Sequence, residues 1–540
     1  MKLEHLSSEV LLAIADRLGV FDLLNIRLLS RFWSNFFLTH ESTLYHSACV
    51  LHGFAKPHQQ LEEAIKEHQT ETQKLRGVVS WKGFCQYNVL LDRYWRMGDS
   101  LHPPRPRIVE RSSFTRNIPH RIKIDSSESL IMNTSDDGGL FVRCASTHKD
   151  LWCMYQEAVR EFAHIEYSNG YAIFDRGENC HEVWVKHSML PNLQVPCEPT
   201  LEQQQNAEGA VDFENDPENP FRGCMVPFGM LRNPIRTRAY RFVYPLLLVA
   251  SEHDRRVVIW HVPTREIVEE FPIDGSEGLE GGAWNPDGPD RINYVELSAT
   301  HVFISLSDRL VVLERGKIAP ELNISQDGIA TPSKPPKAGR KVFEFTRESL
   351  WNDTRLCSSR AHIPFKNPTS DISPHRWITD TNGTFPIARE LADGVVFTAV
   401  HVSPDGGSFV AVSQEGLILY VENMLEVIDV LDKAALDSPI EWGDKMGLWI
   451  LFSGKHISNL AYDGLKIVLN TPSELCVLHL KDALDYDKRF TPSENGLLTI
   501  VSFSRSDGAT VCCIQMSESN IWYTYTGILR FPWPGGMSLP

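Results

Sequence analysis

The chain has 540 residues, of which 42% are hydrophobic and 23% are charged, and its formal net charge at pH 7 is -16. This composition is typical of a globular protein with one large domain and one small domain. The negative charge argues against nucleic acid or an anionic membrane as a partner, and no apolar run approaches the roughly 18 residues of a membrane span. Eleven cysteines without a pairing framework, and no signal segment after Met1, predict reduced thiols and a cytoplasmic and/or nuclear location.

The first apolar pattern runs from Leu6 to Leu18, with large residues recurring every three or four positions. This spacing places them on one face of a helix, which Gly19 is expected to end. A second helix is predicted from Asp22 and a third from Ser30, because both residue types cap helix starts well. Three short helices cannot bury this many large apolar side chains among themselves, so another surface must cover part of them.

The order and spacing of these residues resemble the F-box. The resemblance involves Leu6, Glu9, Leu11, Ile14, Leu18, Asp22, Leu23, Leu28, Leu29, Ser30, Arg31 and Trp33. Ser7 stands where the family usually has Pro, which removes a pre-organised helix start but leaves a capping hydroxyl. The alternative is an amphipathic helical hairpin that packs on the rest of the chain.

The resemblance implies a three-helix F-box over residues 1–53 that binds the adaptor subunit of an SCF-type cullin ubiquitin ligase. The residues expected to contact the adaptor are Leu6, Ser7, Leu11, Ile14, Leu18, Leu23, Leu28 and Trp33.

A helical pattern continues over residues 54–98. Two segments resemble the linker of F-box/WD-repeat proteins: Trp81-Lys82-Gly83-Phe84-Cys85 and Tyr94-Trp95-Arg96-Met97-Gly98. We therefore expect a helical spacer here. Its plainer interpretation is a helix that packs on the next domain, which is also the physical role we expect of it.

After Pro103-Pro104 the periodicity changes to short alternating runs bounded by Gly, Asp, Asn and Pro, which predict strands. Apolar rows surround Trp152, Trp184, Trp260, Val312, Leu419, Val477 and Trp522. These rows predict about seven irregular blades of a β-propeller over residues 99–540. A β-sandwich is less suitable, because the rows continue for more than 400 residues. The fold class is therefore α+β multidomain, with F-box helices and a helical linker before an all-β propeller.

Two stretches resemble parts of a WD repeat. Residues 251–260 place an Asp in a tight turn before an alternating strand that ends at Trp260, although His261 stands where the family has Asp. Residues 402–406, Val-Ser-Pro-Asp-Gly, resemble the turn before the third strand of a repeat. The spacing of the rows is irregular because of insertions near 191–238, 275–290 and 318–393, which we expect to bury little and to be mobile in part.

Signals for catalysis are weak. Gly98-Asp99-Ser100-Leu101 spells the signature of one hydrolase family, but no Asp-x-x-His occurs near the C-terminus to supply a base. Cys180-His181 and Cys512-Cys513 have no second ligand pair, so a metal site is not expected. No phosphate-binding loop occurs, and nothing in the sequence indicates a cofactor. A serine hydrolase that uses Ser100 remains a remote alternative, and the chain is otherwise predicted to be non-catalytic.

Four arginines precede an apolar strand and could bind an acidic or phosphorylated peptide: Arg232, Arg236, Arg238 and Arg241. The plainer interpretation is that they are solvated loop charges. By resemblance, the whole chain is predicted to be a substrate receptor, with the F-box on the adaptor, and through it a cullin, and the propeller on an unknown protein substrate. The alternative is an F-box/propeller scaffold for protein–protein interactions that does not direct ubiquitination.

Overall fold

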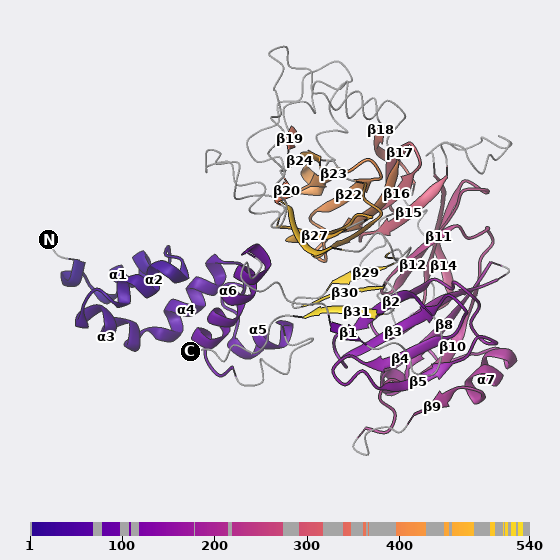
Figure 1. Ribbon diagram of the computed structural model, residues 1–540, viewed down its shortest axis with the longest axis horizontal. Coiled ribbons are helices and arrows are strands. Elements are labelled where there is room, and N and C mark those ends of the chain that lie inside the picture. Colours follow the sequence, from indigo (N-terminus) through magenta and orange to yellow (C-terminus); the bar gives the residue numbers. More distant parts are fainter. Residues whose placement is uncertain are drawn as a thin grey trace, which may run out of the picture.

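In a computed structural model of the protein, helices form an N-terminal arm and strands form a ring beside it (Figure 1). This is the predicted fold class. The structure describes residues 3–68, 78–97, 107–109, 118–177, 179–213, 219–273, 291–316, 339–346, 360–362, 365–366, 396–427, 448–452, 456–472, 474–479, 497–502, 511, 513–516, 520–524 and 528–532. Within these residues, no helix combines the length and the apolar character needed to cross a membrane.

The helices of the arm follow the predicted pattern closely. They are η1 (Leu3–His5), α1 (Ser8–Ala15), α2 (Val20–Arg27), α3 (Arg31–Thr39), α4 (Glu41–Leu51), α5 (Leu61–His68) and α6 (Trp81–Met97). Helix α2 begins at Val20 and not at Asp22, because Gly19 takes the extended N-cap conformation and Asp22 falls within the first turn. Helix α4 is an addition to the three helices expected before residue 53.

Helix α6 connects the arm to the ring. Trp81, Phe84 and Cys85 of α6 are buried in one apolar core with Leu23 of α2 and other side chains of α1–α5. Tyr87, a turn further along, packs against the buried cluster between the last two sheets of the ring. The Nζ of Lys82 also lies 2.9 Å from a carboxylate oxygen of Glu41 in α4. The arm is therefore packed against the ring at α6.

The described strands form seven sheets, each with four or five strands, where the sequence predicted about seven irregular blades. We number them in chain order of their innermost strand. Blade 1 contains β2 (Pro119–Asp125), β3 (Leu130–Ser135), β4 (Leu140–Cys144), β5 (Asp150–Met154) and β9 (Val211–Asp212). Blade 2 contains β6 (Ile165–Ser168), β7 (Tyr171–Arg176), β8 (Cys180–Lys186) and β10 (Met225–Arg232). Blade 3 contains β11 (Ala239–Val243), β12 (Leu246–Ser251), β13 (Arg256–His261) and β14 (Glu266–Pro272).

Blades 4 and 5 are β15 (Ile292–Leu297), β16 (His301–Leu306), β17 (Arg309–Glu314) and β18 (Lys341–Thr346); and β21 (Phe397–Val402), β22 (Phe409–Ser413), β23 (Leu417–Val421), β24 (Leu448–Phe452) and β19 (Arg360–His362). Blades 6 and 7 are β25 (Asn459–Tyr462), β26 (Lys466–Asn470), β27 (Glu474–His479), β28 (Leu497–Ser502) and β20 (Phe365–Lys366); and β29 (Ile514–Met516), β30 (Asn520–Thr524), β31 (Ile528–Pro532) and β1 (Arg107–Val109).

The blades close into a ring. Each innermost strand contacts the next, from β2 through β6, β11, β15, β21, β25 and β29 back to β2. An apolar cluster fills the space between each successive pair of blades, and Ile122 and Ile131 of blade 1 pack with Trp522 and Ile528 of blade 7. Strand β1 pairs with β31, so the last blade contains the first and the last described strands of the ring. This is the sheet-on-sheet packing of a β-propeller.

The ring corrects two expectations from the sequence. The insertion near 191–238 is not mainly a loop, because it contains α7 (Leu201–Glu208), β9 and the largely buried outer strand β10, and it begins at the end of the 3-10 helix η3 (His187–Asn192). The turn at residues 402–406 precedes β22, which is the second strand of blade 5 and not a third strand. Residues 275–290 lie outside the described residues, and so does most of the insertion near 318–393. The domain boundaries at 53 and 98 remain predictions.

Candidate functional site

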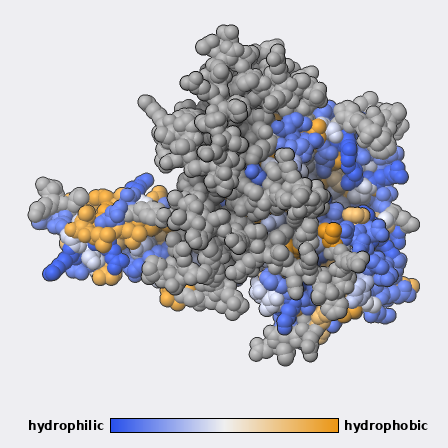
Figure 2. All heavy atoms as spheres, in the orientation of Figure 1, coloured by the Kyte–Doolittle hydropathy of each residue, from blue (hydrophilic) through white to orange (hydrophobic). Residues whose placement is uncertain are grey.

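The arm exposes large apolar side chains on α1, at the end of α2 and on α3. Leu28 and Leu29 are 82% and 71% exposed, and Val10 and Ile14, one turn apart on α1, are 46% and 43% exposed. With the partly exposed ring of Phe32, these residues form what we call the apolar face. Apolar residues are plainly gathered on the arm in the space-filling view (Figure 2). Such a patch is typical of a protein–protein interaction site.

The eight predicted adaptor-binding residues divide into three groups. Ile14 and Leu28 belong to the apolar face, and Ser7, the N-cap residue of α1, is also exposed. Leu6, Leu18 and Trp33 are half-buried at its edge. Leu11 and Leu23 are only 2% and 0% exposed, so they pack in the apolar core of the arm. This corrects the expectation that both would contact an adaptor directly.

Ser30 fixes the junction between α2 and α3. Its hydroxyl oxygen accepts a hydrogen bond from the backbone N–H of Trp33 at 3.3 Å, and its O–H donates to a carboxylate oxygen of Glu4 at 3.1 Å. The cap satisfies one of the free N–H groups at the start of α3. It therefore holds Leu28, Leu29 and Phe32 in their positions on either side of the junction.

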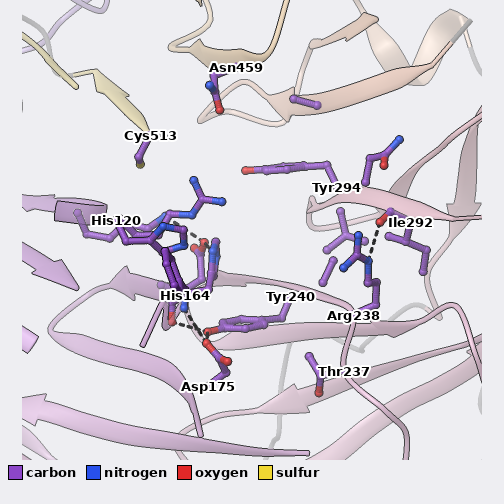
Figure 3. A pocket seen from close by; sticks show the side chains of 18 of the residues that line it. His120, His164, Asp175, Thr237, Arg238, Tyr240, Ile292, Tyr294, Asn459 and Cys513 are labelled. Carbon is purple, nitrogen blue, oxygen red and sulfur yellow. Dashed lines mark hydrogen bonds and ion pairs between the residues drawn. The ribbon is translucent and has the colours of Figure 1, made fainter. Parts of the chain in front are cut away.

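The second candidate site is a cavity of about 860 Å³ in the centre of the ring. Its walls come from the seven innermost strands, from the loop before β11 and from the turn between β7 and β8. Figure 3 shows the ring of Tyr294 extending into this cavity, with Tyr240 on β11 and Arg238 in the loop before it. Phe162 and Arg160 lie at its mouth, where the Phe162 side chain is 55% exposed.

Four charged side chains link neighbouring innermost strands beside the cavity, and we call them the ionic belt. Lys123 of β2 lies 3.0 Å from Glu166 of β6, and Arg241 of β11 lies 3.1 Å from Glu166 and 2.8 Å from Glu296 of β15. The Glu166 and Glu296 side chains are only 2% and 3% exposed. The belt therefore joins four blades through buried, paired charges.

The pKa values of the two belt carboxylates shift in opposite directions. Burial raises the pKa of both, but Lys123 and Arg241 together lower the pKa of Glu166 well below its usual range. Burial keeps the pKa of Glu296 raised, although Arg241 lowers it in part. His401 lies 3.5 Å from Glu296, and burial with Arg241 nearby lowers its pKa to about 3, so this imidazole is neutral at physiological pH.

The four arginines predicted to bind a substrate do not converge. Arg241 is part of the ionic belt, and Arg238 lines the cavity, where its Nε donates to the carbonyl of Ile292 at 3.2 Å. Arg232 contacts the Sγ of Cys180 at 3.7 Å, and the backbone N–H of Arg236 donates to Asp254 at 2.8 Å. Of the four, Arg238 alone is among the residues that line the cavity.

The other residues that the sequence singled out for possible chemistry are Ser100 and the Cys180-His181 pair. Ser100 lies outside the described residues. Cys180 and His181 are buried, and the Nδ1 of His181 lies 2.6 Å from the side-chain nitrogen of Asn233. Over the residues that the structure describes, no group of three or more His, Cys, Asp or Glu side chains could hold a metal ion.

Comparison with known proteins identifies a known domain in the arm. Residues 3–45 match the family model of the F-box domain, whose members generally bind the adaptor of SCF ligases and are generally non-catalytic. No curated protein matches the chain. A solved structure, the β-propeller domain of Cps50 (Swd1) from Myceliophteria thermophila, aligns with 79% of this chain and 98% of its own at 9% identity and a TM-score of 0.41. A TM-score this low supports no argument about function. The chain has an F-box domain followed by a β-propeller, the architecture of a substrate receptor or an interaction scaffold.

Proposed function

We propose that this protein is the substrate-recognition subunit of an SCF-type cullin ubiquitin ligase in the cytoplasm or nucleus. The observation that most supports the proposal is the apolar face, which lies on a matched F-box domain and is not covered by the described parts of the chain. The F-box would bind the adaptor, and through it the cullin. The propeller would hold the substrate.

Covering the apolar face would favour binding. Fully burying a Leu, Ile, Val or Phe side chain contributes about 1.5–3 kcal/mol relative to leaving it exposed. Because Val10, Ile14 and Phe32 are already more than half buried, the five residues together would contribute about 4–8 kcal/mol, which is comparable with the lower estimates of the cost of association, about 4 kcal/mol. Leu28 and Leu29 have the most to gain, because they are the most exposed.

The packing of α6 suits a receptor. Because α6 contributes to the arm core and Tyr87 contacts the ring, a substrate on the propeller would be held at a defined position relative to the adaptor. The chain would then act by proximity, raising the effective concentration of substrate lysines near the ubiquitin-charged enzyme without forming a bond itself.

The proposal is tested by co-precipitation of the adaptor and the cullin with the full chain. Wild type should retain both, and Leu28→Lys should retain neither while its unfolding midpoint is unchanged. Leu425→Lys is a matched control, because Leu425 is 55% exposed on the propeller and distant from the F-box in sequence. Undiminished adaptor capture by Leu28→Lys would contradict the proposal.

A scaffold that binds the adaptor but does not direct ubiquitination would give the same co-precipitation. Affinity purification with mass spectrometry, comparing wild type with Leu28→Lys, should identify proteins that bind both forms of the chain. The abundance of those proteins should rise in cells that lack this chain. Unchanged turnover of every bound protein would favour the scaffold.

A further inference from the structure

One loop of the ring exposes large side chains at both of its ends. Residues 155–162 connect the end of β5 in blade 1 to the start of blade 2. Tyr155 begins this loop and Phe162 ends it, and their side chains are 43% and 55% exposed. Ile118, which directly precedes β2, is also 43% exposed. We call Ile118, Tyr155 and Phe162 the rim, because Phe162 lies at the mouth of the central cavity.

Hydrogen bonds place the parts of the rim side by side. The backbone N–H of Ile118 donates to a carboxylate oxygen of Asp136 at 2.7 Å, in the turn between β3 and β4. In the same turn, the N–H of Gly139 donates to the carbonyl of Val159, within the loop, at 2.9 Å. The start of β2, this turn and the loop therefore lie together at one end of blade 1.

Phe162 is held outward on a fixed backbone. Its φ of 52° lies in the left-handed region, which bulky side chains rarely adopt. The carbonyl of Glu161 accepts a hydrogen bond from Arg160 at 3.0 Å, and the carbonyl of the buried Ala163 accepts one from the Thr134 hydroxyl at 2.7 Å. An aromatic side chain that stays exposed in a costly conformation gains little from packing inside the ring. Aromatic side chains of this kind are enriched in protein–protein interfaces.

The rim is bordered by negative charge. Asp137, Glu157 and Glu161 are exposed, and Asp136 is half-buried. Among the ion pairs of the described residues, none involves these four carboxylates. The cation of the same loop, Arg160, is paired with Asp175 and does not neutralise them. An apolar surface with this border favours a partner that carries positive charge.

We propose that the rim binds an extended segment of substrate in which lysine or arginine residues flank an apolar side chain. The apolar side chain would pack on Phe162, and the flanking cations would lie beside the carboxylates. Burial of apolar area would supply most of the affinity, and the charges would select the partner. The inference rests on the proposed substrate-binding role of the propeller and names its substrate class.

The test uses the full chain and pools of eight-residue peptides with an N-terminal fluorophore. Each peptide of the first three pools carries one central leucine, flanked by lysine and arginine, by aspartate and glutamate, or by serine and glycine. A fourth pool is basic and lacks the leucine. The basic leucine pool should be retained about tenfold or more over the acidic pool, because several exposed ion pairs each add a small factor. This preference should fall at high salt, which screens exposed charges.

Two variants separate the parts of the site. Phe162→Ala should lower retention of the basic leucine pool about tenfold or more, as expected for an aromatic anchor. Glu157→Gln combined with Glu161→Gln should lower the preference for the basic over the acidic pool about threefold to tenfold. Both variants change exposed side chains, so the unfolding midpoint should stay that of wild type.

Blade 5 supplies a matched control. Leu425, directly after β23, is 55% exposed, and Glu422 and Glu426 nearby are exposed carboxylates. Leu425→Ala and the pair Glu422→Gln with Glu426→Gln should change neither retention nor preference. Equal retention of the basic and acidic pools, retention of none, equal retention of the basic pools with and without leucine, or undiminished retention by Phe162→Ala would overturn the inference.

Adaptor capture is measured on the same preparations. If the adaptor is captured while the basic and acidic pools are retained equally, the inference about the rim fails and the ligase proposal stands. If the adaptor is not captured, the ligase proposal itself fails, whatever the peptide pools show.

Discussion

The arm and the ring differ in the kinds of side chain that they expose and bury. The arm leaves Leu28 and Leu29 in solvent, although full burial of a leucine side chain contributes about 1.5–3 kcal/mol. The ring places Glu166 and Glu296 inside, although buried charges are costly unless they are paired. The difference indicates what each part needs from outside. In the proposed function a partner covers the leucines of the arm, whereas the ring pairs its buried charges internally.

The largest expected effect comes from breaking the ionic belt. Glu166→Ala leaves Lys123 and Arg241 without their shared carboxylate in a buried position. We expect the free energy of unfolding of the ring to fall by about 3–5 kcal/mol, measured by chemical denaturation. Glu270→Ala removes an exposed ion pair with Arg256 and should change stability by about 1 kcal/mol or less. Equal effects of the two variants would contradict the role given to the belt.

The second effect separates the core of the arm from its apolar face. Leu23→Ala removes a fully buried side chain and should cost about 2–5 kcal/mol of unfolding free energy. Leu28→Ala removes a side chain that is 82% exposed and should stay within about 0.5 kcal/mol of wild type. Loss of helical signal on denaturation measures both. A large loss of stability in Leu28→Ala would mean that Leu28 packs within the chain.

The third effect concerns acid. His401 has a pKa of about 3 in the folded ring because it is buried, against 6.5 unfolded. As the pH falls below 6.5, His401 is protonated in the unfolded chain but stays neutral in the folded chain. The free energy of unfolding therefore decreases toward pH 3. At pH 5 this histidine should account for about 2 kcal/mol of lost stability. His401→Gln should show a correspondingly smaller loss between pH 7 and pH 5, and an unchanged pH dependence would disprove the assignment.

The smallest effect tests the cap of α3. Ser30→Ala removes the acceptor for the N–H of Trp33 and should cost about 1 kcal/mol of unfolding free energy in the arm. Ser42→Ala is the matched control, because Ser42 is an exposed residue within α4 where alanine is the better helix former. A loss in the control as large as that in Ser30→Ala would exclude capping as the cause.

The sequence predicted the arm well because its signals are local. Leucines and isoleucines at helical spacing and the cap at Ser30 depend on neighbours within a turn. Local spacing could not separate Leu11, which is buried, from Ile14, which is exposed, because both belong to the same apolar pattern on α1. The start of α2 was misplaced at Asp22 because glycine is a weaker capping signal than aspartate.

The ring was predicted in outline but its site was not. Each of the seven apolar rows, from Trp152 to Trp522, falls in a different sheet, since strands buried on both faces read as continuous apolar runs. The ionic belt joins residues from four strands that are far apart in the chain, so spacing could not reveal it. Its one local signal is a charge within an apolar strand, such as Arg241 between Tyr240 and Phe242.

The most direct test of the account is amide hydrogen exchange of the full chain with and without saturating SCF adaptor. Exchange should slow across residues 8–39, which contain the apolar face, and stay unchanged in the strands of blades 1 to 4. Slowing that is confined to the ring, or no slowing at all, would contradict the claim that the adaptor binds the apolar face of the arm.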